Sequence, residues 1–169
     1  MINDNSYVEC LVASKASPVV KFLSILSLVL AIGFFLLSLA GFGILGLILC
    51  VVAGVAYYFL SMNANIEFEY QYCDKEITVD KILNKSRRKN VGKYDVGKLE
   101  VLAPSRSHHL DEFRNRTLKT VDFSAREKNP QPDPTYTFIY DGKEKVIFEP
   151  TDEFVAAVKS VAPRKVFTD

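Results

Sequence analysis

The feature that most constrains this chain is an uninterrupted apolar segment near its N-terminus. Residues 22–60 are 39 consecutive positions without Asp, Glu, Lys, Arg or His. A helix needs roughly 20 apolar residues to cross a bilayer core of about 30 Å. The segment is long enough for two such helices, so it predicts two membrane crossings. This distribution excludes a fully soluble protein, a disordered chain and a collagen-like repeat.

The most favourable place for the chain to reverse is the sequence Ala40-Gly41-Phe42-Gly43. Glycine adopts positive φ without a Cβ clash, so two glycines favour a tight turn. We predict helices near 19–39 and 44–60, in a transmembrane hairpin (19–60) that follows an N-terminal juxtamembrane segment (1–18). A cleaved signal peptide is the alternative, but the apolar core of a signal peptide is usually about 7–15 residues long.

Flanking charge predicts the orientation of the hairpin. Lys15 and Lys21 precede the first span, and the predicted turn carries no charge. Positive residues favour the cytoplasmic side, so we expect a two-pass protein of the cell membrane with both termini in the cytoplasm. Neither span contains an ionisable residue, which argues against a proton relay or an ion pathway.

Small residues recur at four-residue spacing in both predicted spans. They are Gly46, Cys50 and Gly54 in the second span, and Ser27 and Ala31 in the first. Such stripes let helix backbones approach closely in lipid. Packing between the two helices is the simpler interpretation. Self-association or docking on another membrane protein is the alternative.

Residues 61–169 are long enough for one compact domain. Residues 66–73 alternate apolar and polar side chains, which is typical of a strand with one buried face. Further strands are expected within 77–83, 91–94, 98–102, 118–123, 136–140 and 146–148, and Asp141-Gly142 is typical of a hairpin turn. Thr151 precedes an apolar pattern of helical period, which predicts a helix over about 151–162. We therefore expect an α+β fold, in which the two-helix transmembrane hairpin is followed by an antiparallel β-sandwich or partly open barrel capped by a C-terminal helix.

Several short motifs carry a resemblance that covers nearly the whole chain. They are Tyr7-Val-Glu-Cys-Leu-Val12, Ser17-Pro18, Ala103-Pro-Ser-Arg-Ser107 and Ala162-Pro-Arg-Lys-Val-Phe-Thr-Asp169. With the apolar hairpin and the strands, they resemble an uncharacterised family of small bacterial membrane proteins with a pleckstrin-homology-like (PH-like) cytoplasmic domain. The resemblance implies this fold and a membrane tether, and it brings no catalytic motif. PH-like folds bind lipids, peptides or other domains, so the fold alone does not decide the function.

Positive charge is concentrated in one predicted hairpin of the domain. Residues 81–93 contain six basic side chains and no acidic one, whereas residues 61–80 contain five acidic residues and one lysine. Next to anionic lipid, each Lys or Arg contributes roughly 1 kcal/mol of attraction. The candidate lipid or partner contacts are Lys85, Arg87, Arg88, Lys89 and Lys93. The alternative is a solvated turn whose charges balance acidic neighbours.

His108 and His109, close to Asp111 and Glu112, are the residues most similar to a metal site. Adjacent histidines in a strand point to opposite faces, and the spacing of a metal-binding motif is missing. We therefore expect a loop or a short helical turn, packed by Leu110 and Phe113, and no bound metal. Nearby arginines either pair with these acids or extend the basic surface; they are Arg106, Arg114 and Arg116.

The three cysteines, Cys10, Cys50 and Cys73, are far apart and odd in number. They fit a reducing cytosol better than a disulfide framework, and acylation of Cys10 near the membrane is an alternative use. The sequence contains no nucleophile elbow, phosphate-binding loop or zinc-protease motif, so we expect neither an enzyme nor a cofactor. The nearly neutral domain carries no nucleic-acid-binding module.

These observations favour a non-enzymatic, membrane-anchored binding module. Its PH-like domain would contact anionic membrane lipid or a membrane-protein partner, and the basic hairpin is where that contact is expected. The alternative is a structural or accessory subunit of a larger membrane complex, docked through the small-residue stripes and the sheet.

Overall fold

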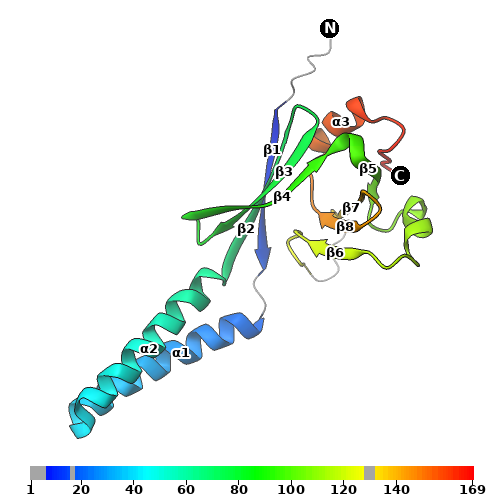
Figure 1. Ribbon diagram of the computed structural model, residues 1–169. Helices are drawn as coiled ribbons and strands as arrows, with labels where there is room; N and C mark the ends of the chain where they lie inside the picture. The colour runs from blue at the N-terminus through cyan, green and yellow to red at the C-terminus, as the bar shows by residue number, and fades with distance from the viewer. Residues whose placement is uncertain (1–6, 16–17, 128–131) are drawn as a thin grey trace. The chain divides into compact units, whose positions relative to one another are not determined.

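The computed structural model describes residues 7–15, 18–127 and 132–169 (Figure 1). These residues form two compact units. The helical unit contains Lys15–Ile66 and Leu83–Arg87. The described residues of the β unit are 7–14 and those within Glu67–Ile82 and Arg88–Asp169. The tip of one β-hairpin therefore groups with the helices.

The apolar segment forms one helical stretch, Pro18–Met62, that is long and apolar enough to cross a membrane. A π-helical turn at Ser38–Phe42 divides it into α1 (Pro18–Leu37) and α2 (Gly43–Met62). Gly41 and Gly43 have φ values of 117° and 53°, which the missing Cβ permits. The helices α1 and α2 lie side by side (Figure 1), so the chain reverses at the predicted glycines. That the segment crosses a membrane twice stays a prediction.

Most of the large apolar side chains that are exposed lie on α1, α2 and the turn between them. A helix that is apolar around its circumference suits lipid better than water. The two buried polar residues of α1, Ser24 and Ser27, have their hydroxyls satisfied within the helix. They donate to the carbonyl oxygens of Lys21 and Ser24, at 2.8 and 2.9 Å.

The first sheet of the β structure has the strand order β1-β2-β3-β4. Its strands are β1 (Val8–Lys15), β2 (Asn65–Cys73), β3 (Glu76–Leu83) and β4 (Arg87–Asp95). The sequence left the place of residues 7–12 open between the membrane interface and a sheet edge, and the structure places residues 8–12 in the edge strand β1. Cys10 is buried, with its Sγ 3.7 Å from the carbonyl oxygen of Glu149. Burial raises the pKa of this thiol, which disfavours acylation.

The second sheet has the order β5-β7-β8-β6. Its strands are β5 (Leu99–Pro104), β6 (Lys119–Asp122), β7 (Tyr136–Tyr140) and β8 (Glu144–Phe148). The pairs β5–β7 and β7–β8 are antiparallel, but β6 and β8 are parallel. The prediction of antiparallel pairing throughout is therefore wrong at β6. The cause is topological, because β8 lies between β6 and β7, and the tight turn after β7 returns β8 in the direction of β6.

The two sheets are separate in the described part of the chain, and no closed barrel forms. Their facing side chains and the C-terminal helix α3 (Asp152–Val161) build the core of the β unit. The Phe154 ring lies 6.5, 6.2 and 6.0 Å, centroid to centroid, from the rings of Tyr70, Tyr72 and Phe148. These four aromatic residues are each at most 2% exposed, so α3 closes the core where its apolar stripe predicts.

The start of α3 follows from its capping residues. The Thr151 hydroxyl oxygen accepts a hydrogen bond from the Phe154 amide at 3.3 Å, and Asp152 and Glu153 occupy the first turn. A hydroxyl cap and early acidic residues both stabilise a helix N-terminus. The structure thus confirms the predicted C-terminal helix.

Candidate functional site

The tip of the β3–β4 hairpin carries two of the predicted contact residues, Lys85 and Arg87. Asn84 and Lys85 have φ values of 47° and 55°, which is the backbone of a two-residue hairpin turn. The Ser86 amide closes it by donating to the Leu83 carbonyl oxygen at 3.1 Å. Lys85 and Arg87 are exposed, and within the described residues neither makes an ion pair. Their charges are therefore available to an external anion.

Within the helical unit, this tip is held at the end of α2. The Asn84 amide donates to the carbonyl oxygen of Asn65 at 2.8 Å. The side chains of the same two residues meet at 3.5 Å, from Asn65 Nδ2 to Asn84 Oδ1. Asn65 follows closely on Met62, the last residue of α2. Lys85 and Arg87 consequently lie near the level at which the apolar helix ends.

Two other predicted contact residues are engaged in ion pairs of the β unit. The Arg88 guanidinium contacts the Glu69 carboxylate and lies 3.9 Å from Asp80 Oδ2. The Lys93 Nζ lies 2.8 Å from Glu76 Oε1. Glu69 and Asp80 are buried, and a buried carboxylate needs a cationic or hydrogen-bonding partner. Arg88 and Lys93 therefore balance acidic neighbours, which is the alternative that the sequence left open for the whole hairpin.

The fifth predicted contact, Lys89, lies in a cationic environment of the β unit. Burial lowers the pKa of Lys81, and the nearby positive charges of Arg126 and Lys89 lower it further. Arg126 has a carboxylate partner, because its Nε lies 3.5 Å from Asp122 Oδ2. Lys89 is exposed and forms no ion pair in the described ranges. Its cluster with Lys81 and Arg126 was not predicted, since Arg126 is far from the hairpin in sequence.

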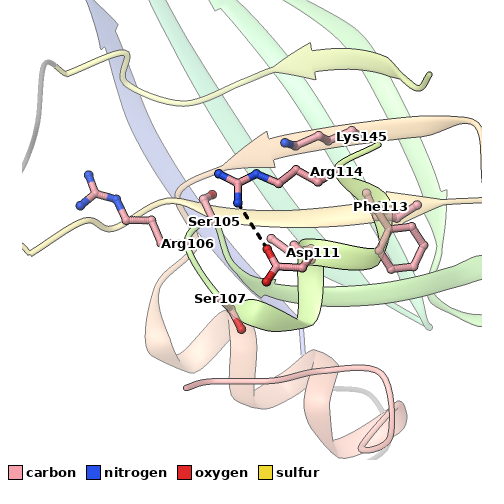
Figure 2. Close-up of a pocket in the computed structure, with 9 residues that line it drawn as sticks. Ser105, Arg106, Ser107, Asp111, Phe113, Arg114 and Lys145 are labelled. Atoms are coloured by element: carbon pink, nitrogen blue, oxygen red, sulfur yellow. Dashed lines mark ion pairs between the residues drawn. The ribbon is translucent and has the colours of Figure 1, made fainter. Parts of the chain in front are cut away.

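A separate pocket of about 270 Å³ opens in the β unit beside the 3₁₀ helix His108–Phe113 (Figure 2). Figure 2 shows Arg114 and Lys145 extending in the same direction, whereas Arg106 points away from them. Three cationic side chains and one carboxylate line the pocket, together with two hydroxyls and an apolar floor. The lining residues are Ser105, Arg106, Ser107, Leu110, Asp111, Phe113, Arg114, Ile139 and Lys145.

Two of the three pocket cations already have carboxylate partners. Arg106 Nε lies 2.9 Å from Asp133 Oδ2, and Arg114 Nη1 lies 3.6 Å from Asp111 Oδ1. Burial alone would raise the pKa of Asp133, but hydrogen bonds from Thr135 and the charge of Arg106 hold it below its usual value. Lys145 makes no ion pair with any described residue. The pocket thus suits a small anion, at a place that sequence reasoning missed because Lys145 comes from β8.

The small residues of α2 that recur at four-residue spacing differ in how closely other parts of the helical unit approach them. A Cβ at Gly46 would lie 2.8 Å from Ser38 Cα, so this glycine permits a close backbone approach. Cys50 is half-buried. A Cβ at Gly54 would meet no described atom within 4 Å. Of the two glycines, Gly46 is therefore in tight contact within the described residues and Gly54 is not.

Comparison with known proteins identifies a family for this chain. The sequence model of a family described as "Bacterial PH-like domain (DUF6106)" matches residues 4–168, which is nearly the whole chain. No curated protein and no solved structure matches the chain.

Proposed function

The chain belongs to the bacterial PH-like domain family, and on this premise we propose that it is a non-enzymatic, membrane-anchored binding module that contacts anionic lipid head groups. The observation that carries the proposal is the position of Lys85 and Arg87. Neither cation makes an ion pair within the described residues. Their turn neighbour Asn84 is hydrogen-bonded to Asn65, which comes three residues after the end of a helix apolar enough to enter a bilayer.

The helical unit supplies the anchor in this proposal. At about 1.5 Å per residue, the 20 residues of α1 and the 20 of α2 each extend over roughly 30 Å, the thickness of a bilayer core. We expect a two-pass topology with both termini in the cytoplasm, because Lys15 precedes the first helix, Lys21 lies in its first turn and the turn between the helices is uncharged. Tyr58, exposed one turn before α2 ends, suits the lipid–water interface.

The contact in this proposal is the electrostatic attraction of Lys85 and Arg87 to anionic lipid head groups. Each Lys or Arg near an anionic bilayer surface adds about 1 kcal/mol of attraction, so Lys85 and Arg87 together add about 2 kcal/mol. This attraction is screened beyond about 8 Å at physiological ionic strength. Only cations held close to the head groups therefore contribute. Arg88 and Lys93 contribute less in this account, since their charge is already balanced by carboxylates.

The experiment is gentle purification of the tagged full-length protein from native membranes, followed by mass spectrometry of the bound lipids and proteins. We expect anionic lipid to be enriched over its share in the membrane. Lys85→Gln with Arg87→Gln should lower this enrichment, by up to roughly 30-fold at low salt for a loss of about 2 kcal/mol.

The matched control is Lys75→Gln with Arg164→Gln. Lys75 is the second residue of the β2–β3 turn and has a φ of 64°. It matches Lys85, which is the second residue of the β3–β4 turn and has a φ of 55°. Arg164 is also exposed. Equal lipid enrichment in all three proteins would overturn the proposed contact. One partner protein at constant ratio, surviving high salt and lost when Gly54 is replaced by a bulky residue, would favour the accessory-subunit alternative, because a side chain at Gly54 meets no described atom of this chain.

A further inference from the structure

We propose that His108, His109 and Asp169 form a binding site for a divalent transition-metal ion that prefers imidazole ligands, with Zn²⁺ as the representative ion. One donor atom from each of the three side chains lies within 4.8 Å of the other two. His109 Nε2 and Asp169 Oδ1 are 3.5 Å apart. The chain contains two histidines in all, and both are in this cluster.

The two histidines converge because residues 108–113 form a 3₁₀ helix. The expected short helical turn is thus confirmed, and the argument that adjacent histidines point to opposite faces applies only to a strand. The Ser107 hydroxyl oxygen caps the turn by accepting a hydrogen bond from the His109 amide at 3.3 Å. The rings of His108 and His109 lie 4.0 Å apart, centroid to centroid, at an interplanar angle of 35°. Both imidazoles therefore face one region.

Asp169 is brought to this region by a C-terminal segment that is tied to β5. The Leu102 amide donates to the Lys165 carbonyl oxygen at 2.7 Å, and the Phe167 amide donates to the Leu102 carbonyl oxygen at 2.8 Å. The Phe167 ring then stacks on His109, with centroids 3.7 Å apart and an interplanar angle of 17°. Backbone and ring contacts thus position the segment that carries the third ligand.

The donor set suits the proposed ion. Zn²⁺ binds imidazole nitrogen and carboxylate oxygen at about 2.0–2.2 Å, so two ligands at tetrahedral angles lie roughly 3.4 Å apart. The 3.5 Å between His109 Nε2 and Asp169 Oδ1 matches this spacing. Imidazole ligands favour zinc, copper and nickel over magnesium and calcium. Three protein ligands leave a coordination position open.

The two histidines line a hollow that also contains carboxylates. A hollow of about 340 Å³ is lined by both histidines together with Glu100 and Glu112. Glu100 is engaged by Arg116, whose Nη1 lies 3.6 Å from Glu100 Oε2. Glu112 is exposed and makes no ion pair within the described ranges. Glu112 therefore offers a carboxylate without an ion-pair partner at the hollow that the two histidines line.

The test is calorimetric titration of chelator-treated, full-length protein in detergent with Zn²⁺ alone. We expect saturable binding of one ion per chain. His109→Ala and Asp169→Asn should each weaken it at least about tenfold, because even the loss of an outer hydrogen-bond partner of a metal ligand costs about 10–100-fold. Asp111→Asn, on the same 3₁₀ helix, and Cys73→Ser, which removes an exposed thiol, are the matched controls and should bind like the unaltered protein.

A second measurement keeps the test independent of folding. In NMR spectra of protein with isotope-labelled histidine, the imidazole resonances of His108 and His109 should both change chemical shift on addition of one equivalent of Zn²⁺. The Asp169→Asn protein should show folded spectra and smaller shifts at the same Zn²⁺ concentration. Absence of saturable binding, or binding unchanged in both His109→Ala and Asp169→Asn, would overturn the site. Loss of Zn²⁺ binding in the Cys73→Ser protein would also overturn the site, because it would show that the thiol is a ligand.

Discussion

Replacement of Phe154 by alanine should destabilise the β unit by about 3–5 kcal/mol, the usual cost of removing a fully buried aromatic side chain. The Phe154 side chain is 0% exposed and lies among Tyr70, Tyr72 and Phe148. Its loss leaves a cavity between α3 and the sheets. Since domains typically have a total stability of about 5–15 kcal/mol, the variant should approach the folding limit.

The measurement is urea unfolding of the full-length protein in detergent, followed by the near-ultraviolet circular dichroism of tyrosine. Ser160→Ala is the control, because Ser160 is exposed on the same helix and should change stability by less than about 0.5 kcal/mol. A loss below about 1 kcal/mol for Phe154→Ala would show that α3 does not close the core.

Replacement of Gly46 by valine should have the largest effect in the helical unit. A Cβ at position 46 would lie 2.8 Å from Ser38 Cα and 2.9 Å from the Ser38 backbone nitrogen. Because backbone atoms cannot move aside as a flexible side chain can, α2 must shift away from the turn. Such overpacking typically costs about 1–3 kcal/mol, and we expect the upper end of this range.

Gly54→Val is the matched control for this prediction, since the same substitution on the same helix meets open space. Thermal unfolding of both proteins in detergent, followed by helical circular dichroism, gives the comparison. We expect a lower midpoint for Gly46→Val and little change for Gly54→Val. Equal midpoints would contradict the close approach of α2 to Ser38.

Periodicity and turn chemistry predict most of the secondary structure of this chain. Gly41 and Gly43 mark the reversal of the helical segment, and Thr151 marks the start of α3. The Asp141-Gly142 turn has φ values of 50° and 62° and joins β7 to β8 as expected. These signals are local, because a positive φ or a capping hydroxyl acts within a few residues.

Non-local pairing is what the sequence did not reveal. The insertion of β8 between β6 and β7 depends on strand order, which hydrophobic alternation does not encode. The edge strand β1 was equally undetermined, because a short apolar segment suits a sheet edge and a membrane interface alike. Periodicity specifies which face of a strand is buried, and leaves its neighbours open.

The candidate contact residues also depend on non-local contacts that the sequence pattern does not reveal. All five cations were treated as one surface because they are close in sequence. Glu69 and Asp80 lie on neighbouring strands, and their burial removes Arg88 from that surface. In the same way, Asp169 reaches His109 only through the contacts of the C-terminal segment with β5. Charge density along a sequence therefore overestimates the charge that is free to bind.

The central claim is that the β3–β4 tip lies at the head groups of a bilayer spanned by the helical unit. The most direct measurement is the depth of a spin label at position 85, in a Lys85→Cys protein without other cysteines, reconstituted into nanodiscs containing anionic lipid. An Ile48→Cys label on α2 is the control and should report the hydrocarbon core. The account predicts a position-85 label at head-group depth. A label at position 85 exposed as in bulk water, with Ile48→Cys in the hydrocarbon core, would contradict it.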